Sequence, residues 1–299
     1  MVESNRIFHT VGIIPVEKRK SIFGYVWDDA LMPIDDGFTA LHRAVLECAA
    51  AGCESIWINC NNDKVKLIRH TIGEYVEDPI YYYRHYATFA SEHKRYIPIF
   101  YCPNHPNDID KRDSYSWGII NAAMNANRSA SKISRHLIPN KFYVAFPFGV
   151  YNPWEVQKYR KKIASEQNFY FSYDGQTVKD GEYLGFTFGQ KDLKAFKEHV
   201  RKTNTPAYKA LSEFKSGGKW IERQPANEKY SARFFTIDKI VESYIIERAH
   251  GEITDWYYRV DGWDKYREFL SSSKSVKMPK RKIFRMRPLG KMNHIAEIE

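Results

Sequence analysis

A chain of 299 residues is long enough to bury a large core in one α/β domain or two smaller ones, which excludes a small scaffold stapled by disulfides or metals. Hydrophobic residues at 43% and charged residues at 27% are typical of an ordinary folded protein and exclude a disordered or collagen-like chain. The formal net charge of +10 indicates attraction to polyanions and carries no information on the fold.

The first predicted elements form a strand–helix–strand unit. Residues 7–16 are a short apolar run typical of a buried strand. Over residues 38–51 apolar side chains recur at helical spacing, and Gly52 stands where a helix C-cap is expected. Residues 55–60 are a second buried strand. This order predicts a βαβ unit and a parallel sheet.

The alternation of strands and helices continues to residue 148. The pattern predicts helices over 64–75 and 86–95, a strand over 97–102, a helix from the N-cap Ser114 to residue 125, and a strand over 141–148. The first half of the chain is therefore predicted to be a doubly wound, mostly parallel α/β sheet.

The second half predicts an extension of this sheet. Strands over 169–173 and 182–188 flank a polar segment with Asp-Gly pairs at 174–175 and 180–181, which indicates a β-hairpin. Helices over 190–202 and 236–248, a strand over 253–260 and a helix over 263–270 follow. Eight basic residues and no acidic one lie between Lys274 and Lys291, so we expect a body over 1–270 and a basic arm over 271–299.

Cysteine usage and the N-terminus point to a cytoplasmic protein. The four cysteines are too few for a disulfide framework and lack the paired spacing of a zinc site, so we expect free thiols in a reducing compartment. Residues 1–10 lack the basic and apolar regions of a secretory signal. No apolar run approaches the roughly 18 residues that span a bilayer, so we expect no membrane contact.

Three places could carry chemistry, and each also has an ordinary structural explanation. Lys18, Arg19 and Lys20 follow the first strand, where cations can hold a triphosphate, although such a run is also typical of a solvated surface. Residues 113–118 open a helix whose N–H groups suit an anion or ribose, or form an ordinary cap. Asp261 follows a strand and could bind Mg²⁺ or cap a helix.

Several runs, in order along the chain, resemble sugar-nucleotide pyrophosphorylases of the nucleotide-diphospho-sugar transferase superfamily. They are LMPIDDGFTALHRAVLECAAAGCESIWI (31–58), residues 113–123, KFYVAFPFGV (141–150), EYLGFTF (182–188) and YRVDGWDKY (258–266). The resemblance is closest to divergent nucleotidyltransferase-like proteins of large phages. It implies a GT-A-like fold and transfer of a nucleotidyl group from an NTP to a sugar 1-phosphate, with Mg²⁺ and release of pyrophosphate.

The resemblance also implies site residues. It assigns catalysis and the metal to Asp261, and Lys18, Arg19 or Lys20 would have to substitute for the catalytic lysine of the family. It assigns nucleotide and sugar binding to Gly12, Pro15, Val16, Gly24, Asn59, Ser114, Ser116, Trp117, Gly118, Gly149 and Gly185. Three features depart from the pattern of the family. The glycine-rich phosphate loop is reduced to Gly12, Asp29 falls near the position of the catalytic lysine, and residues 146–149 replace the turn with the first metal-binding aspartate.

These departures leave other functions open. One alternative is a catalytically degenerate protein that keeps the fold for binding or for a virus-associated assembly role. Another is a nucleic-acid binder, suggested by the charge and by the 15% of aromatic residues. The basic arm could contact nucleic acid, an acidic protein surface or a second copy in a homo-oligomer.

Overall fold

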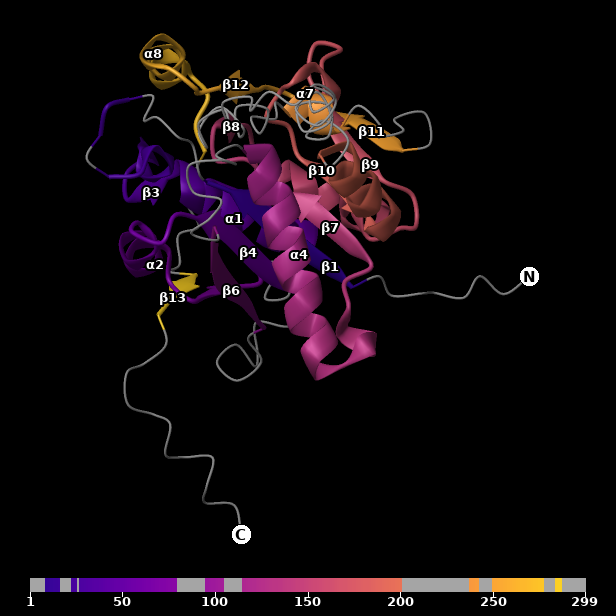
Figure 1. The fold of residues 1–299 in the computed structure, drawn as a ribbon. Helices are drawn as coiled ribbons and strands as arrows, with labels where there is room; N and C mark the ends of the chain where they lie inside the picture. The colour runs from indigo at the N-terminus through magenta and orange to yellow at the C-terminus, as the bar shows by residue number, and fades with distance from the viewer. Residues whose placement is uncertain are drawn as a thin grey trace, which may run out of the picture.

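The computed structural model describes residues 9–16, 23–25, 27–79, 95–104, 115–200, 237–241, 249–276 and 283–286. Their core is a nine-stranded sheet in the order β11-β9-β10-β7-β1-β4-β6-β5-β13 (Figure 1). The four central strands are parallel: β7 (Lys141–Val144), β1 (Thr10–Pro15), β4 (Ser55–Cys60) and β6 (Tyr96–Pro103). The chain builds β4 and β6 on one side of β1 and then returns to place β7 on the other, so the strand order reverses at β1.

The outer strands make the sheet mixed. β10 (Phe186–Gly189) is antiparallel to both β7 and β9 (Phe169–Ser172), and β11 (His250–Ile253) adds in parallel to β9. On the opposite side, β5 (Tyr75–Glu77) is antiparallel to β6, and β13 (Phe284–Arg285) is antiparallel to β5.

Two helices cover opposite faces of the parallel centre. A side chain at Gly12 of β1 would point at Cys48 of α1 (Ala40–Ala51). The side chain of Pro15 of β1 instead lies against Gly118 of α4 (Tyr115–Ile133). Residues 12 and 15 differ by an odd number, so they project from opposite faces of a strand. Figure 1 shows α4 lying across one face of the sheet.

The remaining elements are short. Helices are α2 (Val65–Ile72), α5 (Arg160–Ile163), residues 190–200, α7 (Ile237–Ile240) and α8 (Trp263–Ser271). Single 3₁₀ turns span Asp29–Leu31, Arg135–Leu137, Glu155–Tyr159 and Val178–Asp180. Two small ribbons pair β2 (Pro33–Asp35) with β3 (Phe38–Thr39), and β8 (Gly149–Val150) with β12 (Tyr258–Arg259).

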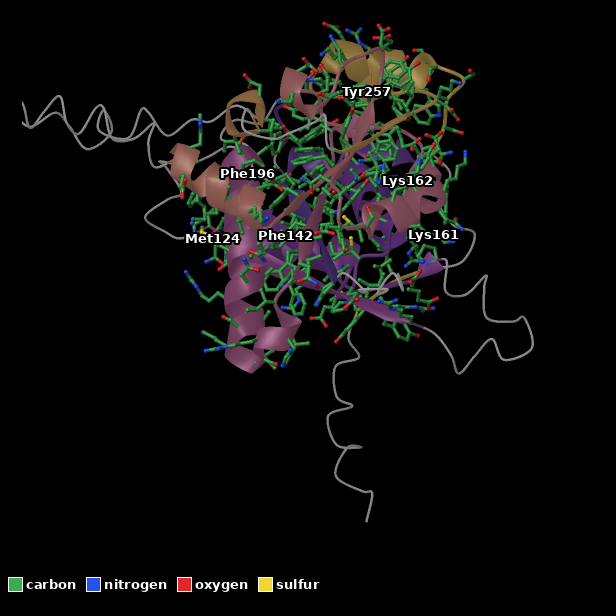
Figure 2. The ribbon with its side chains drawn as sticks, turned by 90° about the vertical axis from the view of Figure 1, so that its right-hand side faces the viewer. Met124, Phe142, Lys161, Lys162, Phe196 and Tyr257 are labelled. Carbon is green, nitrogen blue, oxygen red and sulfur yellow. The ribbon has the colours of Figure 1, made fainter. Side chains whose placement is uncertain are left out.

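Aromatic side chains fill the core between β7, β10 and the helix over 190–200. Phe142 stacks on Phe188 at 5.0 Å between ring centroids, and Phe188 contacts Phe196 at 5.3 Å. Figure 2 shows Phe142 and Phe196 on this side of the molecule, while the exposed Lys161 and Lys162 lie away from them.

The structure confirms the predicted fold class. The strand–helix–strand unit is β1, α1 and β4, and Gly52 ends α1 in the left-handed conformation at φ 92°. β9 and β10 pair as the predicted hairpin extension. Asp174 and Gly175 have φ of 49° and 73°, the positive values that a tight hairpin turn requires.

Several predicted boundaries are wrong. The helix predicted over 64–75 ends at Ile72, and Tyr75 already begins the strand β5. The helix α4 continues to Ile133 instead of ending near residue 125. The predicted strand over 253–260 is two strands, β11 and β12, which belong to different sheets. The predicted helix over 86–95 and the N-cap Ser114 lie outside the residues that the structure describes.

The C-terminal segment contributes to the sheet. β13 pairs with β5, and Ile283 and Phe284 are buried, so the folded body continues beyond the predicted boundary at residue 270. Of the predicted arm over 271–299, residues 277–282 and 287–299 lie outside the described residues. The four cysteines are free and buried, as expected. Within the described residues, no helix has the length and apolar character needed to cross a membrane.

Candidate functional site

The carboxyl ends of β1 and β4 meet the start of α4. The Val16 amide donates to the Asn59 carbonyl at 2.9 Å, which holds the two strand ends together. A side chain at Gly118 would lie 2.8 Å from Asn59 Oδ1 and 3.1 Å from Pro15 Cβ, so α4 approaches both strands closely. Ligands of open α/β sheets bind at this edge, where the strand order reverses. The fold thus brings together predicted residues that are far apart in sequence.

Asn59 anchors a row of hydrogen-bonded asparagines at this edge. Its Nδ2 donates to the Cys102 carbonyl at 2.9 Å and to Asn104 Oδ1 at 3.1 Å, and Asn121 of α4 donates to the same Asn104 oxygen at 3.0 Å. Asn59 Oδ1 and Ser116 Oγ are buried and have no hydrogen-bond partner among the described residues. Buried polar atoms are rarely left unpaired in a folded protein. This edge can therefore accept and donate hydrogen bonds to a ligand.

Tyr115, the first described residue of α4, connects this edge to the next part of the site. Its ring lies edge-on to Tyr183 at 5.4 Å and beside Phe148 at 6.1 Å. Burial raises the pKa of Tyr115 well above its ordinary value, and the charges of Tyr183, Asp28, Asp29 and Asp261 act in the same direction. The phenol is therefore neutral at physiological pH.

Beyond Tyr183 lies an ion-pair cluster centred on Arg259. The guanidinium lies 4.6 Å from the centre of the Tyr183 ring, and its Nε donates to Asp261 Oδ2 at 2.6 Å. Its Nη1 lies 3.4 Å from Glu182 Oε1, and Lys265 Nζ lies 3.2 Å from Asp261 Oδ1. Both Asp261 oxygens are thus paired with cations.

The pairing of Asp261 bears on the predicted magnesium site. Burial alone would raise the pKa of Asp261, but the hydrogen bonds and charges of Arg259 and Lys265 outweigh it and lower the pKa. A divalent cation would have to displace two positive side chains from this carboxylate. Within the described residues, no three His, Cys, Asp or Glu side chains gather as a metal site. The arrangement does not fit a magnesium ion at Asp261, and we assign no step to one.

The predicted glycines mostly serve close packing. A side chain at Gly12 would lie 2.9 Å from Cys48 Sγ, and one at Gly149 would lie 1.8 Å from the Tyr183 carbonyl oxygen. One at Gly185 would lie 2.6 Å from Glu47 Oε1. Gly24, in contrast, is exposed at φ 70°, and a side chain there would meet no other atom of the described residues within 4 Å.

Three predicted catalytic residues, Lys18, Arg19 and Lys20, lie outside the described residues, as does Ser114. The residues on either side of the basic segment over 17–22, Val16 and Phe23, are described. Val16 lies at the carboxyl edge of β1, and Phe23 packs edge-on against Trp263 of α8 at 5.2 Å. The remaining predicted residue, Trp117, is buried in the first turn of α4.

Sequence reasoning missed other polar residues of this edge. Asp28 caps a 3₁₀ turn and forms an ion pair with Lys64 at 3.2 Å, and burial raises its pKa. Asn104 directly follows β6, as Asn61 follows β4. Asparagines placed after consecutive predicted strands are a signal that could have identified this row, since the ends of parallel strands meet at one edge.

Comparisons with known proteins support the fold. No protein-family model matches the chain, and no curated protein matches it. A candidate glucose-1-phosphate thymidylyltransferase from Bacillus anthracis, solved in complex with a sucrose, is 8% identical, with a TM-score of 0.51 over 91% of this chain and 98% of that one. A UDP-glucose pyrophosphorylase complexed with UDP-glucose is 10% identical, with a TM-score of 0.49 over 87% and 96%. Rv0371c from Mycobacterium tuberculosis H37Rv is 12% identical, with a TM-score of 0.47 over 88% and 99%.

The chain has a nucleotide-diphospho-sugar transferase-like fold, as the sequence resemblance predicted. The TM-score of 0.51 over nearly the whole length indicates a shared fold, whereas an identity of 8% leaves the reaction open.

Proposed function

We propose that this protein is a divergent sugar-phosphate nucleotidyltransferase, which binds a nucleoside triphosphate at the carboxyl ends of β1 and β4. The observation that supports this is the pair of buried, unpartnered polar atoms, Asn59 Oδ1 and Ser116 Oγ, among the described residues at the start of α4. A helix N-terminus at the point of strand reversal suits a nucleotide, since its N–H groups face the ligand.

In the proposed reaction, an oxygen of the sugar 1-phosphate attacks the α-phosphorus of the nucleotide. The bond from the α-phosphorus to its bridging oxygen breaks, and pyrophosphate leaves with the electron pair. Asn59 and Ser116 would hold the base or ribose. Lys18, Arg19 and Lys20, in the segment that joins Val16 to Phe23, would stabilise the negative charge on the transferring group and on pyrophosphate.

Ser116→Ala tests the binding site. A buried hydroxyl without a partner costs stability, so we expect the free variant to be as stable as the wild type or about 1 kcal/mol more stable. The thermal stabilisation by a nucleoside triphosphate should fall, because the ligand loses a partner. Ser131→Ala is the matched control, since Ser131 lies on the exposed part of the same helix. A Ser116→Ala protein that is less stable and equally stabilised by nucleotides would contradict the assignment.

The transfer reaction is tested separately by release of pyrophosphate. The four nucleoside triphosphates and their deoxy forms are incubated with hexose 1-phosphates and divalent cations. Formation of a nucleotide sugar together with pyrophosphate is the expected result, and loss of both in a Lys18, Arg19 and Lys20 triple alanine variant would tie the activity to this segment. Nucleotide binding without any product would contradict the proposed reaction.

A second candidate function is nucleotide binding without transfer. The ion pairs of Asp261 favour it, because the carboxylate expected to bind the metal is held by Arg259 and Lys265. Asp29 also favours it, since an acidic, buried residue stands near the position of the catalytic lysine of the family. This function predicts thermal stabilisation by a nucleotide and no pyrophosphate with any sugar phosphate.

A further inference from the structure

Three aromatic side chains form a partly exposed surface where residues 23–27 meet the start of α8. We call Tyr25, Trp27 and Trp263 the aromatic platform. Tyr25 and Trp27 stack with centroids 5.0 Å apart and planes at 20°, while Trp263 meets Tyr25 edge-on at 5.7 Å. Trp27 is 47% exposed and Trp263 is 46% exposed. Two large rings at this exposure in one place differ from the scattered apolar residues of an ordinary surface.

Buried aromatic rings pack against the platform and hold it in place. Phe23 stacks on Tyr25 at 5.7 Å and meets Tyr266 edge-on at 5.8 Å, and both Phe23 and Tyr266 are buried. The Tyr266 hydroxyl donates to the Pro33 carbonyl at 2.5 Å, which ties α8 to the β2–β3 ribbon. The platform is therefore supported by fixed packing, so a ligand would not have to order its rings on binding.

Two buried rings, Phe23 and Phe148, lie between the platform and the candidate nucleotide site. The ring centroids of Phe23 and Phe148 are 6.5 Å apart, and those of Phe148 and Tyr115, at the start of α4, are 6.1 Å apart. A continuous series of rings thus connects the platform to the edge that carries Asn59 and Ser116. The basic segment over 17–22 joins the same two places, since it begins after Val16 and ends before Phe23.

The paired charges around the aromatic platform and its flat rings indicate which class of ligand this surface suits. The charged side chains at the start of α8 are paired with one another, Asp261 with Lys265 at 3.2 Å and Asp264 with Arg267 at 2.7 Å. The described part of this surface therefore presents paired charges beside two partly exposed indoles. A hexose ring suits such a surface, because its C–H face can pack on an indole while its hydroxyls meet polar side chains at the rim.

Gly185, which the family resemblance assigns to ligand binding, has no room for a ligand on the side where a side chain would project. The side of Gly185 on which a side chain would project is filled by Tyr143, Glu47 and Tyr151 within 2.5 to 2.7 Å. We infer that the aromatic platform is a saccharide subsite, which packs the sugar ring of the acceptor substrate against Trp27 and Trp263. This inference rests on the proposed function for the identity of the acceptor, whereas the saccharide contact itself needs no nucleotide.

Saccharide binding is tested with the full chain and without nucleotide. The probes are sucrose and neutral trisaccharides of glucose, mannose and galactose, and ligand-observed saturation-transfer NMR detects their ring protons. Trp27→Ala and Trp263→Ala should each weaken binding by about fivefold or more, which corresponds to one aromatic contact. Trp263→Phe, which keeps a ring against Phe23, should retain part of the signal. Tyr96→Ala is the matched control, since Tyr96 is equally exposed on β6 and lies outside the platform.

The outcomes separate the two proposals. Saccharide binding that depends on both tryptophans supports the subsite even when no nucleotide binds, in which case only the proposed function fails. No response to any probe, or a response that persists in both alanine variants, overturns the subsite. A platform-dependent affinity for an oligothymidylate that falls steeply with salt, in place of saccharide binding, overturns it in favour of single-stranded nucleic acid.

Discussion

At the scale of single residues, the chemistry of a side chain depends on neighbours that its local sequence does not reveal. Asp261 follows a strand and precedes a helix, a position at which a carboxylate suits either a metal or a cap. In the folded chain it is the partner of Arg259 and Lys265. Asp261 therefore holds the Arg259 guanidinium in its position over the Tyr183 ring.

Asp261→Asn should therefore act on stability in a pH-dependent way. Because the ion pairs lower the pKa of Asp261 below its ordinary value of 3.8, they stabilise the fold above about pH 4, and this contribution disappears as the pH falls through the lowered pKa. We expect the substitution to cost about 1 kcal/mol at pH 7 and less at pH 3. Urea denaturation at both pH values measures the difference. Asp264→Asn, at an exposed ion pair in the first turn of α8, is the control, and an equal cost of Asp261→Asn at both pH values would refute the prediction.

His42 is a second residue whose environment determines its protonation. Its Nδ1 accepts from the Thr39 amide at 3.3 Å in the capping box of α1, and its ring meets Phe284 of β13 at 4.6 Å. Burial lowers the pKa of His42 from 6.5 to about 4. A protonated imidazole would lose this acceptor.

The stability of the protein should consequently fall between pH 6.5 and pH 4. In this range the unfolded chain binds a proton at residue 42 that the folded chain does not, so acidification favours unfolding by up to about 3 kcal/mol. His42→Gln should flatten this part of the pH profile of the unfolding free energy. His136→Gln, at an exposed histidine, should leave the profile as it is, and identical profiles for the two variants would exclude His42 as the cause.

At the scale of elements, the strongest local signals predicted structure well. Residues 55–60 form β4 as predicted, and α1 ends at the predicted cap because Gly52 can adopt φ 92° without a Cβ clash. Weak or very short elements escaped prediction. β5 has three residues, and β13 has two within a run of basic residues, so neither has a periodic pattern of its own. Both exist because a neighbouring strand offers an edge to pair with.

Truncation should show that β13 is part of the fold. A chain ending at residue 276 loses the pairing of Phe284 with Val76, the contact of Phe284 with His42 and the ion pair of Arg285 with Glu77 at 3.3 Å. We expect a cost of about 3 kcal/mol, as for removal of a buried phenylalanine, and a lower melting temperature. A chain ending at residue 286 keeps β13 and is the matched control. Equal melting temperatures for the two truncations would show that β13 contributes nothing to stability.

At the scale of the whole molecule, a buried polar cluster connects α1 to β7 and to the segment around β8. Arg43 and Glu47 are fully buried, and Arg43 Nη1 lies 2.8 Å from Glu47 Oε2. Tyr143 of β7 donates to Glu47 at 2.6 Å, Tyr151 donates to the same carboxylate, and Arg43 donates to the Phe146 carbonyl at 2.5 Å. These contacts hold the turn between β7 and β8 against α1.

Removing only the carboxylate of this cluster should lower the free energy of unfolding more than replacing both charged residues by apolar ones. Glu47→Ala leaves the Arg43 guanidinium buried without its carboxylate, so we expect a loss of about 3 to 5 kcal/mol in the free energy of unfolding. The double variant Arg43→Met with Glu47→Met removes both charges and should recover a large part of that loss. Chemical denaturation of the three proteins measures the difference. A double variant that is no more stable than Glu47→Ala would show that the charges themselves are not the dominant cost.

The sequence alone determined what depends on neighbours within a few residues. Apolar periodicity, caps and tight turns identified β1, α1, β4 and the β9–β10 hairpin, because the backbone preferences involved are local. It also placed Pro15, Asn59 and Gly118 at the same candidate site through a resemblance of motifs.

Only the tertiary structure decided which of these segments contact one another and which partners each side chain has. The approach of Gly118 to Asn59, the pairing of Asp261 with Lys265 and Arg259, and the packing of Phe23 on Trp263 join segments that the sequence does not bring together by itself. Such contacts depend on strand order and on the packing of helices and loops against the sheet, and no local pattern encodes those. For this reason the sequence predicted the fold and the edge that carries the candidate site, whereas the tertiary structure decided the partners of Asp261 and the position of the aromatic platform.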